Sequence, residues 1–450
     1  MRFIRQHFFL LVMILFTLVY SYANTGVRYE FLPLTSFFLI GLFSIYGLFL
    51  SIDRYAISLN KTFCLFYYFF FSIAPITQFK QSTVFFVKDK YISDALYTKS
   101  SIVLLIILVF YLLLYHLIYS YFEKIKLNPK KILQADLQLK SGDLLIGISS
   151  ISVIFYLYLI KYNWDLLIFR PFVFRLKDNT NLGLLGYAIL LVIQLIPFVC
   201  LVRYKLMKSV TDKKTYLLFF LMLLVCFPTA LSRSIVAMLY IPIFLFFIPI
   251  LSVKKNYIKM YLWGLLFVFP LFNNFRYLYE RNFNFNYQLF GTAHFDAFQN
   301  FTFLLDEKII TNGRQLLGSI LFFVQEGQWR NRPMGTGTLL AEKLAYSYTN
   351  VAMPFFGEGY ANFGYLGIFL FLVFIAVFNV FLDYRFTQGT MSHLLKIIFY
   401  FFLGFEFYLL RGDLYSSIKI LASFALAIFF VEAIFFMNNY THSRSGKIYA

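Results

Sequence analysis

Residues 101–122 read SIVLLIILVFYLLLYHLIYSYF and contain no Lys, Arg, Asp or Glu. A helix that crosses a membrane needs about 20 consecutive apolar residues, so this stretch predicts a transmembrane helix. Other apolar runs of this kind lie on both sides of it. Together they predict twelve spans, at about residues 8–22, 31–51, 62–79, 101–122, 144–160, 183–202, 216–231, 235–251, 260–272, 365–382, 394–410 and 417–437.

The composition of the whole chain agrees with these spans. Of the 450 residues, 60% are apolar, 22% are aromatic and only 14% are charged. An ordinary soluble domain is about half apolar and about a quarter charged. The composition therefore excludes a soluble globular enzyme, a disordered chain and a fibrous protein. It predicts an all-α polytopic membrane protein with about 12 transmembrane helices.

The net charge of +19 does not predict nucleic-acid binding. The basic residues lie in short clusters between apolar runs and do not form one continuous face. In a membrane protein such clusters orient the spans and contact anionic lipid. The three cysteines lie inside apolar runs without metal-ligand spacing, and no carboxylate cluster suggests a metal. We therefore expect no disulfide framework, no metal and no cofactor.

The distribution of Lys and Arg among the loops predicts the orientation of the spans, because cytoplasmic loops are enriched in these residues. If both termini are cytoplasmic, the more basic loops all fall on the cytoplasmic side. The outer loops are less basic, although residues 80–99 and 161–182 carry four Lys or Arg each. The basic set consists of Arg2, Arg5, Lys124, Lys126, Lys130, Lys131, Lys140, Arg203, Lys205, Lys208, Lys213, Lys214, Lys254, Lys255, Lys259, Arg444 and Lys447.

The first run has an alternative interpretation as a signal peptide. Arg2 and Arg5 precede an apolar core, and residues 21–23 offer a small-x-small cleavage site. The apolar core is long and aromatic, which favours a retained span. Cleavage would change no later orientation.

Three parts follow from the predicted spans. Residues 1–272 hold spans one to nine, and residues 361–450 hold the last three and a cytoplasmic tail. Residues 273–360 form a long segment on the outer (periplasmic) face, where a helical apolar pattern covers 313–325. Seven Lys or Arg balance seven Asp or Glu there, and we expect a folded cap with amphipathic helices on the membrane. Residues 335–337, Gly-Thr-Gly, resemble a flexible loop.

Several arginines fall at the predicted outer surface. A guanidinium makes bidentate contacts to phosphate and stays charged, so converging arginines would suit a lipid pyrophosphate. Each one could instead be an interfacial anchor or half of an ion pair. Arg233 and Arg411 have almost no loop around them, which makes an anchor less expected there. The predicted pyrophosphate-binding residues are Arg170, Arg175, Arg233, Arg276, Arg281 and Arg411.

Acid–base candidates lie near these arginines. His294 and Asp296 are two residues apart in the outer segment, Glu358 precedes the tenth span, and Asp413 follows Arg411 closely. Such a group could accept a proton from a sugar hydroxyl. The alternative is that each one hydrogen-bonds to the backbone of its loop. No phosphate-binding glycine loop of the GxxxxGK[ST] kind is present, which argues against an ATP-driven pump.

The most distinctive stretch is FGEGYANFGYLG at residues 356–367. Small residues at this spacing let a helix or a lipid-linked substrate approach the backbone, and a glutamate is favourable near a helix N-terminus. A Gly-Glu-x-Tyr-x-Asn-Phe-Gly-x-x-Gly stretch entering a late span resembles the Wzy-type polymerases of O-antigen and capsular repeat units. The large outer segment, residues 70–75 (FFSIAP) and residues 411–414 (RGDL) add to the resemblance.

The resemblance implies an activity and a location. Such an enzyme of the GT-C-like membrane glycosyltransferases works at the outer face of the bacterial inner membrane. It moves a growing glycan from undecaprenyl pyrophosphate onto a fresh lipid-linked oligosaccharide repeat unit, with the lipid pyrophosphate as leaving group. The implied partners are this lipid-linked oligosaccharide, membrane lipid and a separate chain-length regulator protein. By motif, Glu358 matches the family's glutamate, Arg411 its late arginine and Arg233 a mid-chain outer arginine.

Two other functions remain open. An O-antigen ligase uses the same lipid donor with a different acceptor and also has a large outer loop. A flippase or other transporter of lipid-linked sugars is not an enzyme, and it tends to have two similar halves and short loops. We find no similarity between the halves, and the long segment lies on one side only. Charge deep within the spans would favour the transporter.

Overall fold

The structure, a computed structural model, consists of helices joined by turns and loops throughout its described part. The account below concerns these residues only. They are 2–23, 26–50, 57–87, 91–125, 141–169, 183–208, 210–252, 254–264, 267, 289–324 and 328–448.

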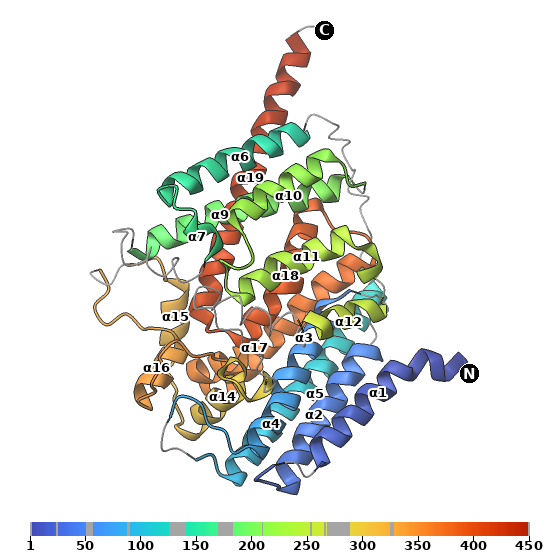
Figure 1. The fold of residues 1–450 in the computed structure, drawn as a ribbon, viewed down its shortest axis with the longest axis vertical. Helices are drawn as coiled ribbons and strands as arrows, with labels where there is room; N and C mark the ends of the chain where they lie inside the picture. The colour runs from blue at the N-terminus through green and yellow to red at the C-terminus, as the bar shows by residue number, and fades with distance from the viewer. Residues whose placement is uncertain are drawn as a thin grey trace.

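In these ranges, 8 helical segments are long and apolar enough to cross a membrane, which fits a polytopic membrane protein. Most of them pack along one another in a bundle (Figure 1). They are α2 (Phe31–Phe49), the segment Leu59–Lys80 made of α3 (Leu59–Tyr67), η1 (Tyr68–Ile73) and α4 (Ala74–Lys80), α5 (Asp94–Ile125), α6 (Ser141–Leu159), α9 (Gly183–Met207), α17 (Phe355–Thr387), α18 (His393–Arg411) and α19 (Leu414–Ile448).

Four of the twelve predicted spans differ from this set. The runs at 8–22 and 235–251 form shorter apolar helices within α1 (Arg2–Tyr22) and α11 (Arg233–Phe247). The run at 216–231 is shortened because α10 (Lys213–Val225) stops before Pro228. Its 13 residues reach about 20 Å, less than the roughly 30 Å of a bilayer core. The run at 260–272 begins in α12 (Lys254–Trp263) and continues outside the described residues. The count of twelve stays a prediction.

Helices α5 and α17 show how polar residues are accommodated inside the bundle. Tyrosines one turn apart on α5 face polar residues one turn apart on α17, always with the same offset of 268 residues. A constant offset means that the two helices run parallel. The pairs are Tyr111 with Asn379 at 3.0 Å, Tyr115 with Asp383 at 2.8 Å, and Tyr119 with Thr387 at 3.4 Å. Each buried hydroxyl thereby gains a hydrogen-bond partner.

Helix α19 connects the two ends of the bundle. It begins at Leu414 and forms an ion pair with α9 through Glu432 and Arg203. Glu432 lies 18 positions after Leu414, which is about 27 Å along the helix and close to the thickness of a bilayer core. The basic end is the one that carries Arg203, Lys205, Lys208, Lys213 and Lys214 at the end of α9 and the start of α10. Arg203 and Lys205 belong to the loops predicted to be cytoplasmic, so the end where α19 begins corresponds to the predicted outer face.

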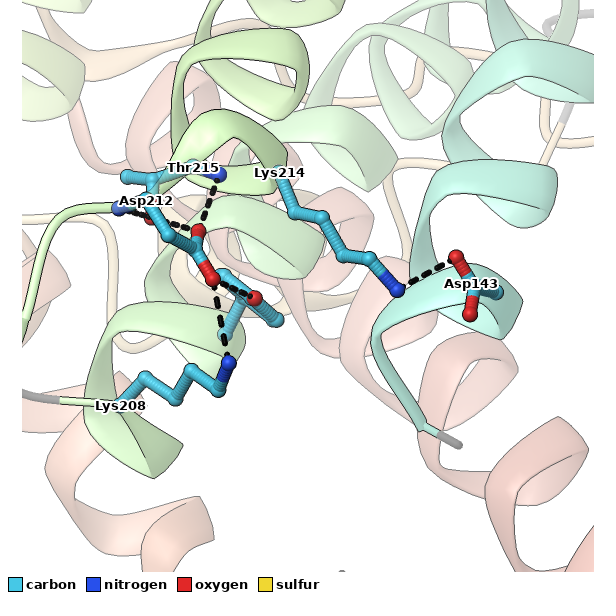
Figure 2. A network of polar contacts seen from close by, with 6 residues as sticks. Asp143, Lys208, Asp212, Lys214 and Thr215 are labelled. Atoms are coloured by element: carbon cyan, nitrogen blue, oxygen red, sulfur yellow. Dashed lines mark hydrogen bonds and ion pairs between the residues drawn. The ribbon is translucent and has the colours of Figure 1, made fainter. Parts of the chain in front are cut away.

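Figure 2 shows a polar network at the basic end. Asp212 caps α10: its Oδ1 accepts from the Thr215 N–H at 2.9 Å, and its Oδ2 accepts from Lys208 Nζ at 3.1 Å. Lys214 Nζ bonds to Asp143 on α6 at 2.6 Å. The network therefore ties the end of α9 and the start of α10 to the start of α6.

The network predicts acid sensitivity. Hydrogen bonds, chiefly from the Tyr204 hydroxyl, hold the pKa of Asp212 below its ordinary value. Its contribution to stability is thus present at neutral pH and is lost as the pH falls toward this lowered pKa. We expect the melting temperature of the purified protein to fall less between about pH 5 and pH 3 in Asp212→Asn than in wild type. The exposed Asp306→Asn is the control, and equal acid sensitivity in all three proteins would contradict the prediction.

The outer segment contributes several short helices near the start of α17 (Figure 1). The predicted helix at 313–325 is shorter in the structure, since α15 begins after Gly313, whose φ is +82°, and ends at Ile320. Residues 336 and 337 begin a helix, which corrects the expectation of a flexible loop at 335–337. The elements are η5 (Leu289–Gly291), η6 (Ala293–Phe295), α14 (Ala297–Asp306), α15 (Arg314–Ile320) and α16 (Thr336–Lys343).

Candidate functional site

Charged side chains from separate segments meet where α18 ends and α19 begins. Arg411 is the last residue of α18, and α19 starts three residues later at Leu414. The start of α17 brings Glu358 to this corner, and the outer segment brings Asp296. We call Asp296, Glu358, Arg411 and Asp413 the corner cluster. It joins a cation to three carboxyl groups at the predicted outer end of the bundle.

Asp296 and Arg411 form an ion pair across the cluster. Arg411 Nη2 donates to Asp296 Oδ1 at 3.2 Å. The other Asp296 oxygen accepts from Asn300 Nδ2 at 3.0 Å and from the Ala352 N–H at 3.1 Å. The Asp296 side chain is only 3% exposed, whereas that of Arg411 is 33% exposed. The guanidinium is therefore anchored by one edge and accessible to an anion on another.

Glu358 is almost fully buried, and both of its carboxylate oxygens accept hydrogen bonds. Oε2 accepts from the Thr336 hydroxyl at 2.5 Å, and Oε1 accepts from the Leu414 N–H at 2.9 Å. The carboxylate thus bridges the first residue of α16 and the first residue of α19. A negative group beside the N-termini of two helices is favourable electrostatically.

Asp413 lies beside Glu358 and is held mainly by backbone groups. Its Oδ2 accepts from the Gly337 N–H and its Oδ1 from the Tyr415 N–H, both at 2.9 Å. A Cβ on Gly335 would collide with this carboxylate, so the chain can approach it only as glycine. Burial raises the pKa of Asp413, although the backbone N–H groups oppose the shift. The corner thus concentrates two interacting acidic groups.

A break within α17 sets the position of Glu358. Phe363 and Gly364 are non-helical, and Gly364 has φ +64° and ψ −147°, a conformation that is essentially restricted to glycine. Eight residues of straight helix would separate Gly359 from Gly367 by about 12 Å. Instead, a Cβ on either glycine would collide with the backbone carbonyl of the other. The stretch 356–367 is therefore a sharp reversal that leaves Glu358 on a short helix of its own.

The break exposes backbone carbonyls, and the outer segment satisfies them. The carbonyl of Ala361 accepts from the Thr311 N–H at 2.7 Å, and that of Asn362 accepts from the Gly313 N–H at 2.9 Å. The Asn362 side chain accepts from the Leu316 N–H at 2.7 Å, near the start of α15. These bonds fasten residues 311–316 to the reversal. The glutamate-bearing helix and the outer segment thus form one packed unit.

Arg233 lies at the same end of the bundle as Arg411. On α11 the backbone at Ala237 contacts Gly404 of α18, and the Phe246 ring lies 4.4 Å from the Tyr400 ring. Residue numbers rise on α11 as they fall on α18, so the two helices are antiparallel. Arg233, one turn before Ala237, is therefore on the Arg411 side. Its helix is capped by Ser232, whose side chain accepts from the Ile235 N–H.

The remaining predicted residues are distributed unequally. His294 lies in η6, half-buried and two residues before Asp296. Four of the predicted arginines, Arg170, Arg175, Arg276 and Arg281, lie outside the described residues. Among the described residues, no three His, Cys, Asp or Glu side chains gather as metal ligands would. Arg233, His294, Asp296, Glu358, Arg411 and Asp413 can thus be placed, and four of them form the corner cluster.

Some residues of the site were not expected from the sequence. Thr336 bonds to Glu358, and Asn300 bonds to Asp296, to the Ala352 carbonyl and to the Tyr346 hydroxyl. A single Thr or Asn in an apolar stretch has no spacing that identifies it. The one available signal was Gly335 and Gly337 on either side of Thr336, since paired glycines indicate a close backbone approach.

Comparisons of this chain with protein families, curated proteins and solved structures find no match. The fold and the cluster nevertheless define a class. It is a polytopic membrane protein, helical in its described part, with a charged site at one end of the helix bundle.

Proposed function

We propose that the protein polymerises undecaprenyl-pyrophosphate-linked oligosaccharide repeat units into O-antigen or capsular polysaccharide at the periplasmic face of the bacterial inner membrane. The growing glycan leaves its pyrophosphate carrier and is joined to a sugar hydroxyl of a fresh lipid-linked unit. The reaction is a glycosyl transfer within a GT-C-like architecture of about 12 spans, with both termini cytoplasmic. The choice of this reaction is supported by the resemblance of residues 356–367 to Wzy-type polymerases.

The observation that carries the proposal is the corner cluster. Segments 115 residues apart bring Asp296 and Arg411 together, and segments 56 residues apart bring Glu358 and Leu414 together. Anchored cations beside carboxylates supply both needs of this transfer. A cation stabilises the departing pyrophosphate, whose charge grows in the transition state, and a carboxylate accepts the proton of the acceptor hydroxyl. Arg411 and Arg233 serve the first role.

Glu358, Asp296, His294 and Asp413 are the candidates for the proton-accepting role. We assign it to Glu358, because its helix is set apart by the reversal in α17 and both its oxygens already accept hydrogen bonds. Thr336 covers the carboxylate in this structure. The acceptor hydroxyl would replace the Thr336 hydroxyl on Oε2, so movement of residues 333–337 is part of the proposal.

The proposed orientation has its own test. Ile310 is exposed in the outer segment, and Val210 is exposed in the loop at the basic end. In intact spheroplasts, we expect an impermeant thiol reagent to label Ile310→Cys but not Val210→Cys, and lysis should make Val210→Cys reactive. The native Cys64, Cys200 and Cys226 are buried and give a low background. The reverse pattern of labelling would overturn the orientation.

A transporter of lipid-linked sugars is the second candidate, favoured by charge inside the bundle. Glu406 on α18 is fully buried, and Asp383 on α17 is 1% exposed. Asp383 accepts from the N–H groups of Leu59 and Asn60 and from the Tyr115 hydroxyl, so it caps α3 as a structural group. A buried charge with a structural role is weak support for a transporter. The corner cluster is therefore the stronger support, and it favours glycosyl transfer.

The surface glycan of a strain lacking this gene distinguishes the candidates. A single repeat unit on the lipid core is the result expected for a polymerase, and reintroduction of the gene should restore the ladder. Bare core with long chains left on the carrier would indicate an O-antigen ligase. Bare core with single units trapped on the cytoplasmic face would indicate a flippase. An unchanged ladder would remove this pathway altogether.

A further inference from the structure

Residues 332–337, which we call the strap, lie over the proposed proton acceptor. They form an irregular stretch that leads into α16 at Thr336. The Thr336 hydroxyl donates to Glu358 Oε2, and Thr336 and Glu358 are each only 1% exposed. An acceptor hydroxyl can therefore take the place of the Thr336 hydroxyl only when the strap moves. The contacts that hold the strap thus determine how often Glu358 is accessible.

The strap fits between α15 and the start of α19. Pro333 is buried against α15, where a Cβ on Gly318 would collide with the proline. At the other end of the strap, the Gly337 N–H donates to Asp413 Oδ2 at 2.9 Å. Met334 between them is 50% exposed, so the strap lies at the surface of the described chain.

Arg332 holds the start of the strap. Its guanidinium donates to the carbonyls of Phe322 and Val324, both at 2.8 Å, and to the Tyr415 hydroxyl at 2.6 Å. Its Cζ also lies 5.1 Å from the centre of the Tyr415 ring, within the range of a cation–π contact. Arg332 therefore joins the strap both to the residues that follow α15 and to α19.

Three consecutive residues at the start of α19 connect the strap to the carboxylate that it covers. In chain order, they bind the end of the strap, the proton acceptor and the start of the strap: Asp413 binds Gly337, the Leu414 N–H binds Glu358, and Tyr415 binds Arg332. The Tyr415 N–H also donates to Asp413 Oδ1 at 2.9 Å, so the two attachment points of the strap are themselves joined. The strap is thus closed at both ends on one short segment, with Thr336 between them.

Each of these contacts lowers the open fraction, which is the fraction of molecules in which the strap is displaced from Glu358. A hydrogen bond from a charged group is stronger than one between neutral groups. Loss of the bond between Arg332 and Tyr415 should therefore raise the open fraction about tenfold, which corresponds to about 1.4 kcal/mol. The apparent affinity of a ligand that binds only the open form rises in proportion to the open fraction.

We propose that Arg332 and Tyr415 are positioning residues that hold the strap closed over Glu358 and thereby set the apparent affinity for the acceptor glycan. The proposal rests on the proposed function, because closure affects the acceptor only if Glu358 is the proton acceptor. It goes beyond that function, since none of the roles assigned above uses Arg332 or Tyr415.

Hydrogen exchange of the purified full-length protein in detergent tests the contact directly. Tyr415→Phe keeps the ring beside Arg332 and removes only the hydroxyl. We expect the amides of residues 334–337 to exchange about tenfold faster in this variant, while those of α5 keep their rate. Arg332→Met removes the same contact from the other side and should accelerate the exchange at least as much. Tyr240→Phe is the matched control, because it removes a hydroxyl that donates to the Cys226 carbonyl at 2.7 Å, and the strap should then exchange as in wild type.

The kinetics of polymer formation in liposomes test the consequence for the acceptor. Tyr415→Phe should lower the KM for lipid-linked repeat units by up to about tenfold, because more molecules have an accessible Glu358. A variant that merely loses folded protein would lower the rate and leave KM unchanged. The control Tyr240→Phe should keep the wild-type KM.

Equal exchange of the strap in Tyr415→Phe and Tyr240→Phe would overturn the proposal, since the contact would then not hold the strap closed. Faster exchange with an unchanged KM would overturn the effect on the acceptor. Failure of the polymerase proposal is a separate result. In that case wild type forms no polymer, which removes the effect on the acceptor, while the faster exchange in Tyr415→Phe still shows that the contact closes the strap.

Discussion

Arg411→Ala should abolish polymer formation while the protein remains in the membrane. The substitution removes the cation that faces the proposed departing pyrophosphate, and loss of one such electrostatic contact lowers a reaction rate about 100- to 1,000-fold. It also deprives Asp296 of its ion-pair partner. Because Arg411 is a third exposed, we expect this to cost only roughly 1–3 kcal/mol of stability. The measurement is the glycan ladder of a complemented deletion strain, normalised to the amount of protein in the membrane.

A second ion pair provides the matched control. Arg28 pairs with Asp94 near the start of α5, and neither residue belongs to the corner cluster. Arg28→Ala should lower stability by a similar mechanism and leave the ladder per molecule of protein unchanged. Arg411→Lys keeps the charge without the planar fork and should retain partial activity. A full ladder in Arg411→Ala would exclude the pyrophosphate role.

Glu358→Gln should also be inactive, and it should fold normally. The glutamine oxygen can accept from the Leu414 N–H, and its NH₂ can donate to the Thr336 hydroxyl, which rotates to accept. Both hydrogen bonds are then kept: the bond from the Leu414 N–H is unchanged, and the bond with the Thr336 hydroxyl is reversed in direction. Only the capacity to take up a proton is lost. A general base contributes about 100- to 10,000-fold to a rate, so the ladder should collapse to single units.

Glu406→Gln is the control for this substitution. Glu406 is also a fully buried glutamate in the described helices, and its Oε1 accepts from Asn379 Nδ2 at 2.7 Å. A glutamine can accept the same bond, and the residue lies outside the corner cluster. Glu406→Gln should therefore give a normal ladder. If Glu358→Gln also gives a normal ladder, Glu358 is not the proton acceptor, and Asp296, His294 and Asp413 become the candidates.

The long apolar runs predicted the helices well, because a helix that crosses a membrane requires only a long enough run of apolar residues. Residues 101–122 lie within α5, and residues 365–382 lie within α17. The shorter runs were harder to interpret. Residues 216–231 are apolar apart from Thr229, but the helix ends at Val225, ahead of Pro228, so apolar character alone overestimated its length.

The candidate site could be predicted only in part. The glycines of residues 356–367 predicted the approach of a neighbouring helix or a lipid-linked substrate, whereas the close approach in the structure lies within the stretch itself, between Gly359 and Gly367. The sequence could not pair Asp296 with Arg411, because contacts between distant segments follow from the packing of whole helices. The same holds for Thr336 on Glu358. Those residues have no local pattern that links them.

The central claim is that the corner cluster performs glycosyl transfer from a lipid pyrophosphate. The most direct test uses the purified protein reconstituted in liposomes with lipid-linked repeat units from the deletion strain. Wild type should form long glycans and release undecaprenyl pyrophosphate in proportion to the bonds formed, whereas Glu358→Gln should do neither. Absence of both products with wild type, or equal product with Glu358→Gln, would contradict the claim.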